Sequence, residues 1–112
     1  MKLWLDDERP PPDLTWCWAR TVHEVRLLLQ RGTVEVLSLD NDLGSYSVKT
    51  GLEGRHALDD VIERAFCGTP PPKVVIHTQN PIARLSMVSA INAANRYGVG
   101  IQAEIRPART PP

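Results

Sequence analysis

The sequence lacks most features of secreted, membrane and bulk nucleic-acid-binding proteins. Its two cysteines, Cys17 and Cys67, lie far apart without metal-ligand spacing, so we expect reduced thiols in the core of a cytoplasmic protein. No signal sequence is recognisable, and no apolar run approaches the roughly 20 residues that cross a membrane, so we expect no membrane association. The 13 basic and 13 acidic residues cancel, which argues against bulk binding of nucleic acid but not against recognition of one phosphate.

A chain of 112 residues can bury a core without disulfides or metals, and we expect one domain over residues 1–112. Thr21 followed by Glu24 predicts the start of a helix that ends at Gly32, and Asn80 before Pro81 predicts the start of another. The expected strands are residues 3–5, 15–20, 34–39, 73–77 and 100–106. The expected helices are residues 21–32, a segment ending near Gly68, and residues 80–97, with a loop through Gly44 and Gly51 after the third strand.

Strands that alternate with helices and are apolar on both sides predict a parallel sheet covered by helices on both faces. The link over residues 6–14 is too short for a full crossover helix, so we expect the first helix to be shortened or missing. Right-handed crossovers then give a doubly wound, flavodoxin-like α/β fold with strand order 2-1-3-4-5. An antiparallel pairing of the first two strands is the main alternative.

Four of the expected strands end in polar residues, namely Asp6–Asp7, Asp40, His77–Thr78 and Arg106. Open α/β sheets bind ligands at the carboxyl ends of their strands. Burying a carboxylate without partners is costly, so acids in these places indicate a binding site rather than a core.

The acids suit a divalent cation. Mg²⁺, or Mn²⁺ in its place, prefers oxygen ligands and relieves the repulsion between converging carboxylates. We expect the side chains of Asp6, Asp7 and Asp40 as ligands, with the backbone carbonyl of Asp42 completing the set. The alternative is that some of these acids cap turns or helices.

The stretch "HTQNP", residues 77–81, indicates a phosphate site beside the metal. Thr78 offers a hydroxyl, and Asn80 precedes a helix whose N–H groups and dipole attract an anion. Histidine titrates near neutrality, so His77 suits proton transfer. A histidine in an apolar strand is more often a hydrogen-bonded core residue, and the polar neighbours of His77 make the two interpretations about equal. Arg9 and Arg84 could each reach a phosphate, and for Arg84 a solvated role is favoured.

Together these residues resemble the response-regulator receiver domain, with the acid pair Asp6–Asp7, then Asp40, Thr78 and Arg106 in the family's order. In that family the acids hold Mg²⁺, the residue at the place of Asp40 accepts phosphate, and a Thr and a Lys contact the phosphoryl group. Arg106 stands here where receivers have the Lys. The blocks "DDERP", "SLDNDLG" and "IHTQNP" are similar to a divergent branch, the cyclic-phosphate-processing receiver-like domains.

The leading hypothesis is therefore metal-dependent hydrolysis of a cyclic phosphate, such as a 2′,3′-cyclic RNA end or a cyclic nucleotide. His77 would protonate the departing ribose oxygen, and Asp40 would be a metal ligand or the nucleophile. The expected phosphate ligands are Thr78, Asn80, Arg9 and Arg106. The alternatives are a signalling module phosphorylated on Asp40 and a degenerate receiver that only binds a partner. The sequence predicts neither the substrate nor the oligomeric state.

Overall fold

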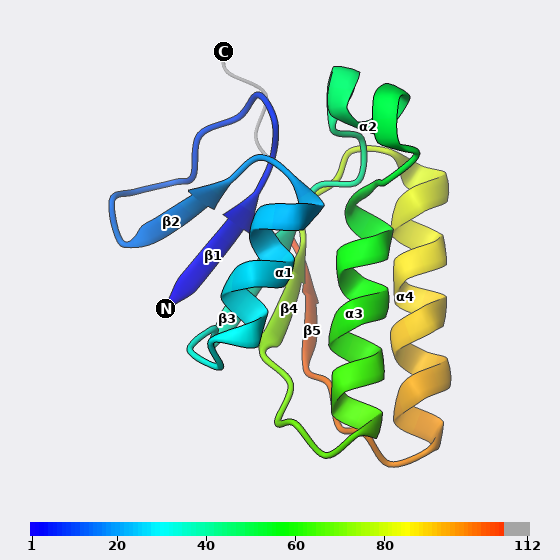
Figure 1. Cartoon of the computed structure of the whole chain (residues 1–112). Helices are drawn as coiled ribbons and strands as arrows, with labels where there is room; N and C mark the ends of the chain where they lie inside the picture. The colour runs from blue at the N-terminus through cyan, green and yellow to red at the C-terminus, as the bar shows by residue number, and fades with distance from the viewer. Residues whose placement is uncertain (107–112) are drawn as a thin grey trace.

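The computed structural model describes residues 1–106, which form a five-stranded parallel sheet with four helices (Figure 1). The strand order is β2-β1-β3-β4-β5, and all four neighbouring pairs are parallel. Both features confirm the predicted receiver-like fold and exclude the antiparallel alternative. The elements are β1 (Lys2–Leu5), β2 (Trp16–Ala19), α1 (Val22–Gln30), β3 (Val36–Leu39), α2 (Gly44–Thr50), α3 (Gly54–Phe66), β4 (Lys73–Ile76), α4 (Pro81–Arg96) and β5 (Ala103–Ile105).

The crossover helices α1, α3 and α4 lie in one row on one face of the sheet (Figure 1). The connections from β2 to β3, from β3 to β4 and from β4 to β5 advance across the sheet in the same direction, so right-handed crossovers place their helices on the same side. The link from β1 to β2 runs in the opposite direction and contains no helix, as the sequence predicted. Helices on both faces were expected; within residues 1–106 they cover one face only, because that first crossover helix is missing.

The core lies between the sheet and this row of helices. Alternate residues of the three central strands are fully buried and pack against the inner sides of α1, α3 and α4, with Leu3, Leu5, Leu37, Leu39, Val74 and Ile76 as the strand residues. The opposite side of these strands carries a row of register partners, Trp4, Ser38 and Val75, and these are buried as well. Asp6, Asp40 and His77 each follow a residue of this second row by two positions, so they lie on the same side of the sheet at its carboxyl edge.

Two local features differ from the sequence prediction. Residues Gly44–Thr50, expected as loop, form the short helix α2; none of them is buried, so they lack the apolar periodicity by which a helix is recognised. Cys17 and Cys67 are exposed rather than in the core, because Cys17 lies on the edge strand β2 and Cys67 follows the last turn of α3. Pro107, expected to end the last strand, lies outside the described residues, as does the rest of the expected domain to residue 112.

No helix within residues 1–106 is both long enough and apolar enough to cross a bilayer.

Candidate metal and phosphate site

The strands β1, β3 and β4 end level with one another in the sheet register. The ladder continues one residue beyond them: the Asp40 N–H donates to the Leu5 carbonyl at 2.9 Å, and the His77 N–H donates to the Leu39 carbonyl at 3.0 Å. Asp6, Asp40 and His77 therefore leave the sheet at the same edge, as the sequence pattern predicted.

Asp6, Asp7 and Asp40 converge at this edge, with one carboxylate oxygen of each within 4.8 Å of the others. Ligands held at roughly 2.1 Å from one Mg²⁺ lie up to about 4 Å apart, so a small inward adjustment lets these oxygens share a cation. Gly44 makes room for them: its φ is 59°, and a Cβ there would lie 2.5 Å from Asp7 Oδ2. An all-oxygen donor set in this spacing fits Mg²⁺ or Mn²⁺.

The three carboxyl groups have unequal pKa values. Burial, followed by the charge of Asp6, raises the pKa of Asp40 to about 6. Burial and the neighbouring charges of Glu8, Asp6 and Asp42 raise the pKa of Asp7. Burial also acts to raise the pKa of Asp6, but hydrogen bonds from His77 and from backbone N–H groups outweigh it and lower that pKa. A cation would relieve the unfavourable charges at Asp7 and Asp40.

His77 lies behind Asp6 rather than at the open side of the site. Its side chain is 1% exposed, and burial lowers its pKa against the opposing effect of Asp6. Both ring nitrogens have partners, Nδ1 with Ser38 Oγ at 2.7 Å and Nε2 with Asp6 Oδ2 at 3.1 Å. The ring also stacks on Trp4, with centroids 3.8 Å apart. The geometry therefore matches the alternative of a hydrogen-bonded buried histidine and does not support direct proton transfer to a substrate.

Two tryptophans fix the loop that carries the acid pair. The Trp4 Nε1–H donates to the Arg9 carbonyl at 2.8 Å, and the Trp18 Nε1–H donates to the Asp6 carbonyl at 2.7 Å. The Arg20 guanidinium lies over the Trp18 ring, 4.1 Å from its centroid. The sequence analysis missed these bonds, although three tryptophans in a chain with one phenylalanine were a usable signal.

The acids open on a cavity of about 340 Å³. Arg9 is the only basic side chain in its lining among the described residues, and its Nη2 donates to Gln79 Oε1 at 2.8 Å. This bond links the loops that follow β1 and β4. The lining consists of Asp6, Asp7, Glu8, Arg9, Asp40, Asp42, Gly44, Thr78, Gln79 and Asn80.

The sequence model of the cyclic-phosphate processing Receiver domain matches residues 1–93. The chain belongs to this family. Comparisons with curated proteins and with solved structures gave no significant match. The matched region of this cyclic-phosphate processing receiver domain includes every residue that lines the cavity, and it ends before β5.

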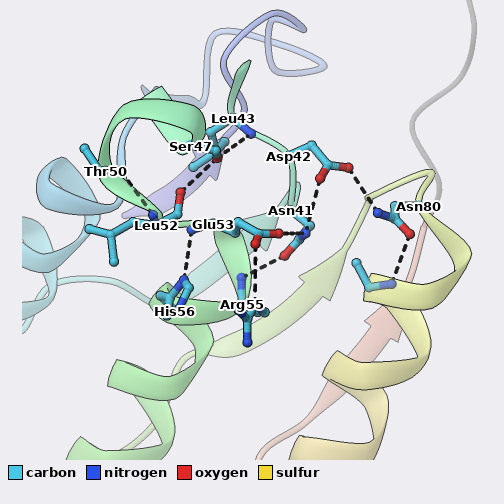
Figure 2. A network of polar contacts seen from close by, with 11 residues as sticks. Asn41, Asp42, Leu43, Ser47, Thr50, Leu52, Glu53, Arg55, His56 and Asn80 are labelled. Carbon is cyan, nitrogen blue, oxygen red and sulfur yellow. Dashed lines mark hydrogen bonds and ion pairs between the residues drawn. The ribbon is translucent and has the colours of Figure 1, made fainter. Parts of the chain in front are cut away.

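The loop after β4 places Thr78 and Asn80 in the lining of this receiver domain. Thr78 is 1% exposed, and its side chain forms a hydrogen bond with Asp40 that acts to lower the pKa of Asp40. Asn80 Nδ2 donates to Asp42 Oδ2 at 3.3 Å (Figure 2). Both side chains therefore lie beside acids of the site, where the sequence analysis expected phosphate ligands.

The first N–H groups of α4 are already bonded. The N–H groups of Ile82 and Ala83 both donate to Asn80 Oδ1 at 3.1 Å, and the Asn80 N–H donates to Thr78 Oγ1 at 3.2 Å. Pro81 has no N–H. The sequence analysis expected free helix N–H groups to attract an anion. Because the Asn80 side chain accepts from these N–H groups, only the helix dipole remains to attract one.

The two remaining arginine candidates are occupied elsewhere. Arg106 makes two hydrogen bonds to Glu104 Oε1, at 3.1 and 2.6 Å, and is not among the residues that line the cavity. Arg84 is half-buried, and its Nη2 donates to the Thr78 carbonyl at 3.2 Å, so it is not simply solvated. Arg9 is therefore the basic residue that the structure brings to the site.

Asn41, between two predicted metal ligands, was missed by the sequence analysis and organises the loop after β3 (Figure 2). Its side chain is buried; Nδ2 donates to Glu53 Oε2 at 2.6 Å, and Oδ1 accepts from the Arg55 N–H at 3.1 Å. The loop is thereby bonded to the start of α3. The Asp42 side chain lines the cavity, while its backbone carbonyl as a metal ligand stays a prediction.

Proposed function

We propose that this domain hydrolyses a cyclic phosphodiester, such as a 2′,3′-cyclic RNA end or a small cyclic nucleotide, in a reaction that depends on Mg²⁺ or Mn²⁺. The observation that carries the proposal is the convergence of three carboxylates within 4.8 Å at a cavity of about 340 Å³. Membership of the cyclic-phosphate processing receiver family supports the substrate class.

Asp6, Asp7 and Asp40, with the carbonyl of Asp42, would hold the cation. When bound, the cation would neutralise phosphate charge and acidify a water molecule. Arg9 would exchange its bond with Gln79 for a charge-assisted bond to a phosphate oxygen. The hydroxyl of Thr78 and the amide of Asn80 would orient the phosphate beside Asp40 and Asp42.

The reaction adds one water molecule. The water oxygen bonds to phosphorus, one ring P–O bond breaks, and one proton of the water ends on the departing ribose oxygen, so no further reactant is needed. In place of His77, which is outside the cavity lining, solvent in the open cavity would deliver that proton. Asp40 would contribute through its negative charge and its position, and not as the donor of this proton.

The charge of the site favours a cyclic phosphate over a phosphate monoester. Five carboxylates and one guanidinium line the cavity, so one divalent cation leaves the site negative. A cyclic phosphodiester carries one negative charge, whereas the monoester produced by ring opening carries up to two. The substrate therefore meets less repulsion than the product, which would assist product release.

A second candidate function is phosphorylation of Asp40 in a signalling module. It is favoured by the Asp40 carboxyl in the cavity lining and by its bond with Thr78. The position of Arg106 weakens it, because the basic residue that receivers place on the phosphoryl group is bonded to Glu104 here.

The test incubates the protein with 2′,3′-cyclic nucleotides and Mg²⁺ or Mn²⁺, with a chelator in a parallel reaction, and follows ring opening by chromatography. Asp40→Asn is the matched variant, because it keeps the shape of the side chain and removes its charge. Ring opening that needs the cation and Asp40 is the expected result. Labelling of Asp40 by acetyl phosphate without any ring opening would establish the signalling function instead.

A further inference from the structure

A buried row of side chains lies behind Asp6. Ser38 and His77 are 0% and 1% exposed, and Trp4 covers the His77 ring with the two planes 3° from parallel. Ser38 bonds to His77 Nδ1, and His77 Nε2 bonds to Asp6 Oδ2. The row therefore ends on a carboxylate of the candidate metal site.

The hydrogen bonds determine where the protons lie. An ionised carboxylate only accepts, so the His77 Nε2 must carry the hydrogen that reaches Asp6. In a neutral ring Nδ1 is then an acceptor, and the Ser38 hydroxyl is its donor. Stacking on Trp4 and packing against Ser38 hold the ring in that orientation.

Most of the lone pairs of the Asp6 carboxylate already accept hydrogen bonds. Its Oδ1 accepts the N–H groups of Glu8 and Arg9, both at 2.9 Å, and its Oδ2 accepts from His77 at 3.1 Å. Because a carboxylate offers about four lone-pair sites, one remains, on Oδ2. Asp6 can then give a cation one oxygen but cannot chelate it through both.

We propose that His77, oriented by Ser38 and Trp4, is a positioning residue that makes Asp6 a one-oxygen ligand and thereby selects Mg²⁺ or Mn²⁺ over Ca²⁺. Mg²⁺ takes six single oxygens in a strict octahedron, whereas Ca²⁺ takes six to eight and commonly uses both oxygens of a carboxylate. The inference rests on the metal site of the proposed function and not on the identity of the substrate.

The test measures dissociation constants for Mg²⁺ and Ca²⁺ by calorimetry, without substrate. His77→Phe keeps a ring against Trp4 and removes the donor, whereas His77→Gln can offer an amide N–H near the place of Nε2. Loss of a hydrogen bond to a metal ligand typically changes metal affinity about 10–100-fold. We expect His77→Phe to shift the ratio of Ca²⁺ to Mg²⁺ affinity toward Ca²⁺ by about tenfold or more. Ser38→Ala should shift this ratio less, and His77→Gln should retain most of the wild-type preference for Mg²⁺.

A preference that stays within about twofold in a folded His77→Phe protein would overturn the inference and leave the proposed function intact. If His77→Phe does not fold, ¹⁵N spectra of the wild-type imidazole decide: a hydrogen on Nε2 alone supports the inference, and a hydrogen on Nδ1 overturns it. A wild-type protein that binds neither cation would overturn the inference together with the metal dependence of the proposed function.

Discussion

Gly54 lies so close to Asp40 that a Cβ on Gly54 would be 1.7 Å from the Asp40 carbonyl oxygen. The Gly54 N–H also donates to the Asn41 carbonyl at 2.8 Å. The first residue of α3 thus packs backbone against backbone on the residue at the centre of the candidate site. Only a residue without a side chain permits this contact.

We expect Gly54→Ala to lower the free energy of unfolding by about 1–3 kcal/mol, as overpacking does, although alanine is the better helix former. The displaced Asp40 should also weaken the response of the protein to Mg²⁺. Urea unfolding and melting curves with and without Mg²⁺ measure both effects. Gly51→Ala is the control, because its left-handed φ of 72° introduces strain while its Cβ would meet nothing within 4 Å. A normal Mg²⁺ response in Gly54→Ala would show that this contact does not position Asp40.

Divalent cations should stabilise the folded protein, because they relieve repulsion among Asp6, Asp7 and Asp40. A ligand at about 100 times its dissociation constant adds roughly 2.7 kcal/mol. Melting curves at millimolar Mg²⁺ and Mn²⁺ measure the shift of the midpoint, with Asp7→Asn as the variant that should lose most of it. An unchanged midpoint in the wild type would count against the metal site.

The response to the cation should depend on pH through Asp40. Its pKa is raised to about 6 by burial and by Asp6, so the folded state binds this proton more tightly than the unfolded chain does. The stability that Asp40 contributes to the metal-free protein is therefore fully present below its unfolded pKa and is lost as the pH rises through about 6.

A cation must displace the same proton, so its apparent affinity should fall by up to about tenfold for each pH unit below 6. Calorimetric titrations with Mg²⁺ between about pH 5 and pH 8 test this. Asp40→Asn should bind weakly at every pH and lose the pH dependence. An affinity that is flat across that range would mean that Asp40 is already ionised in the metal-free protein.

The acids could be found from the sequence because they interrupt apolar strands, and the strand register then fixed their place at one edge. The orientation of His77 could not be found from the sequence, because the ring contacts Asp6 from two strands away. That orientation depends on packing against Trp4 and Ser38. The helix α2 has no buried residue and therefore left no periodic pattern. Arg106 follows β5 as expected, but the direction of its long side chain is set by Glu104, which no strand pattern specifies.

The last prediction distinguishes Arg106, which the receiver resemblance implies as the phosphate ligand, from Arg9, which lies in the cavity lining. Arg9 lines the cavity and is bonded to Gln79, whereas Arg106 is bonded to Glu104 outside the lining. A hydrogen bond to a charged group contributes about 1.5–3 kcal/mol, so Arg9→Ala should weaken binding of a cyclic phosphate by roughly 10–100-fold. Its fold should persist, because the bond from Trp4 goes to the Arg9 backbone carbonyl and not to the side chain.

Arg106→Ala is the matched control and should change binding of the cyclic phosphate by less than about threefold. Arg106 lies outside the lining, and its exposed ion pair with Glu104 contributes little free energy. Equilibrium binding of a non-hydrolysable cyclic phosphate analogue, measured with Mg²⁺ present, gives both values. Arg9→Lys should recover only part of the loss, since a point charge cannot form the two parallel bonds of a guanidinium. The opposite ranking, with Arg106→Ala the more damaging change, would mean that Arg106 leaves Glu104 on ligand binding and takes the place of the receiver lysine.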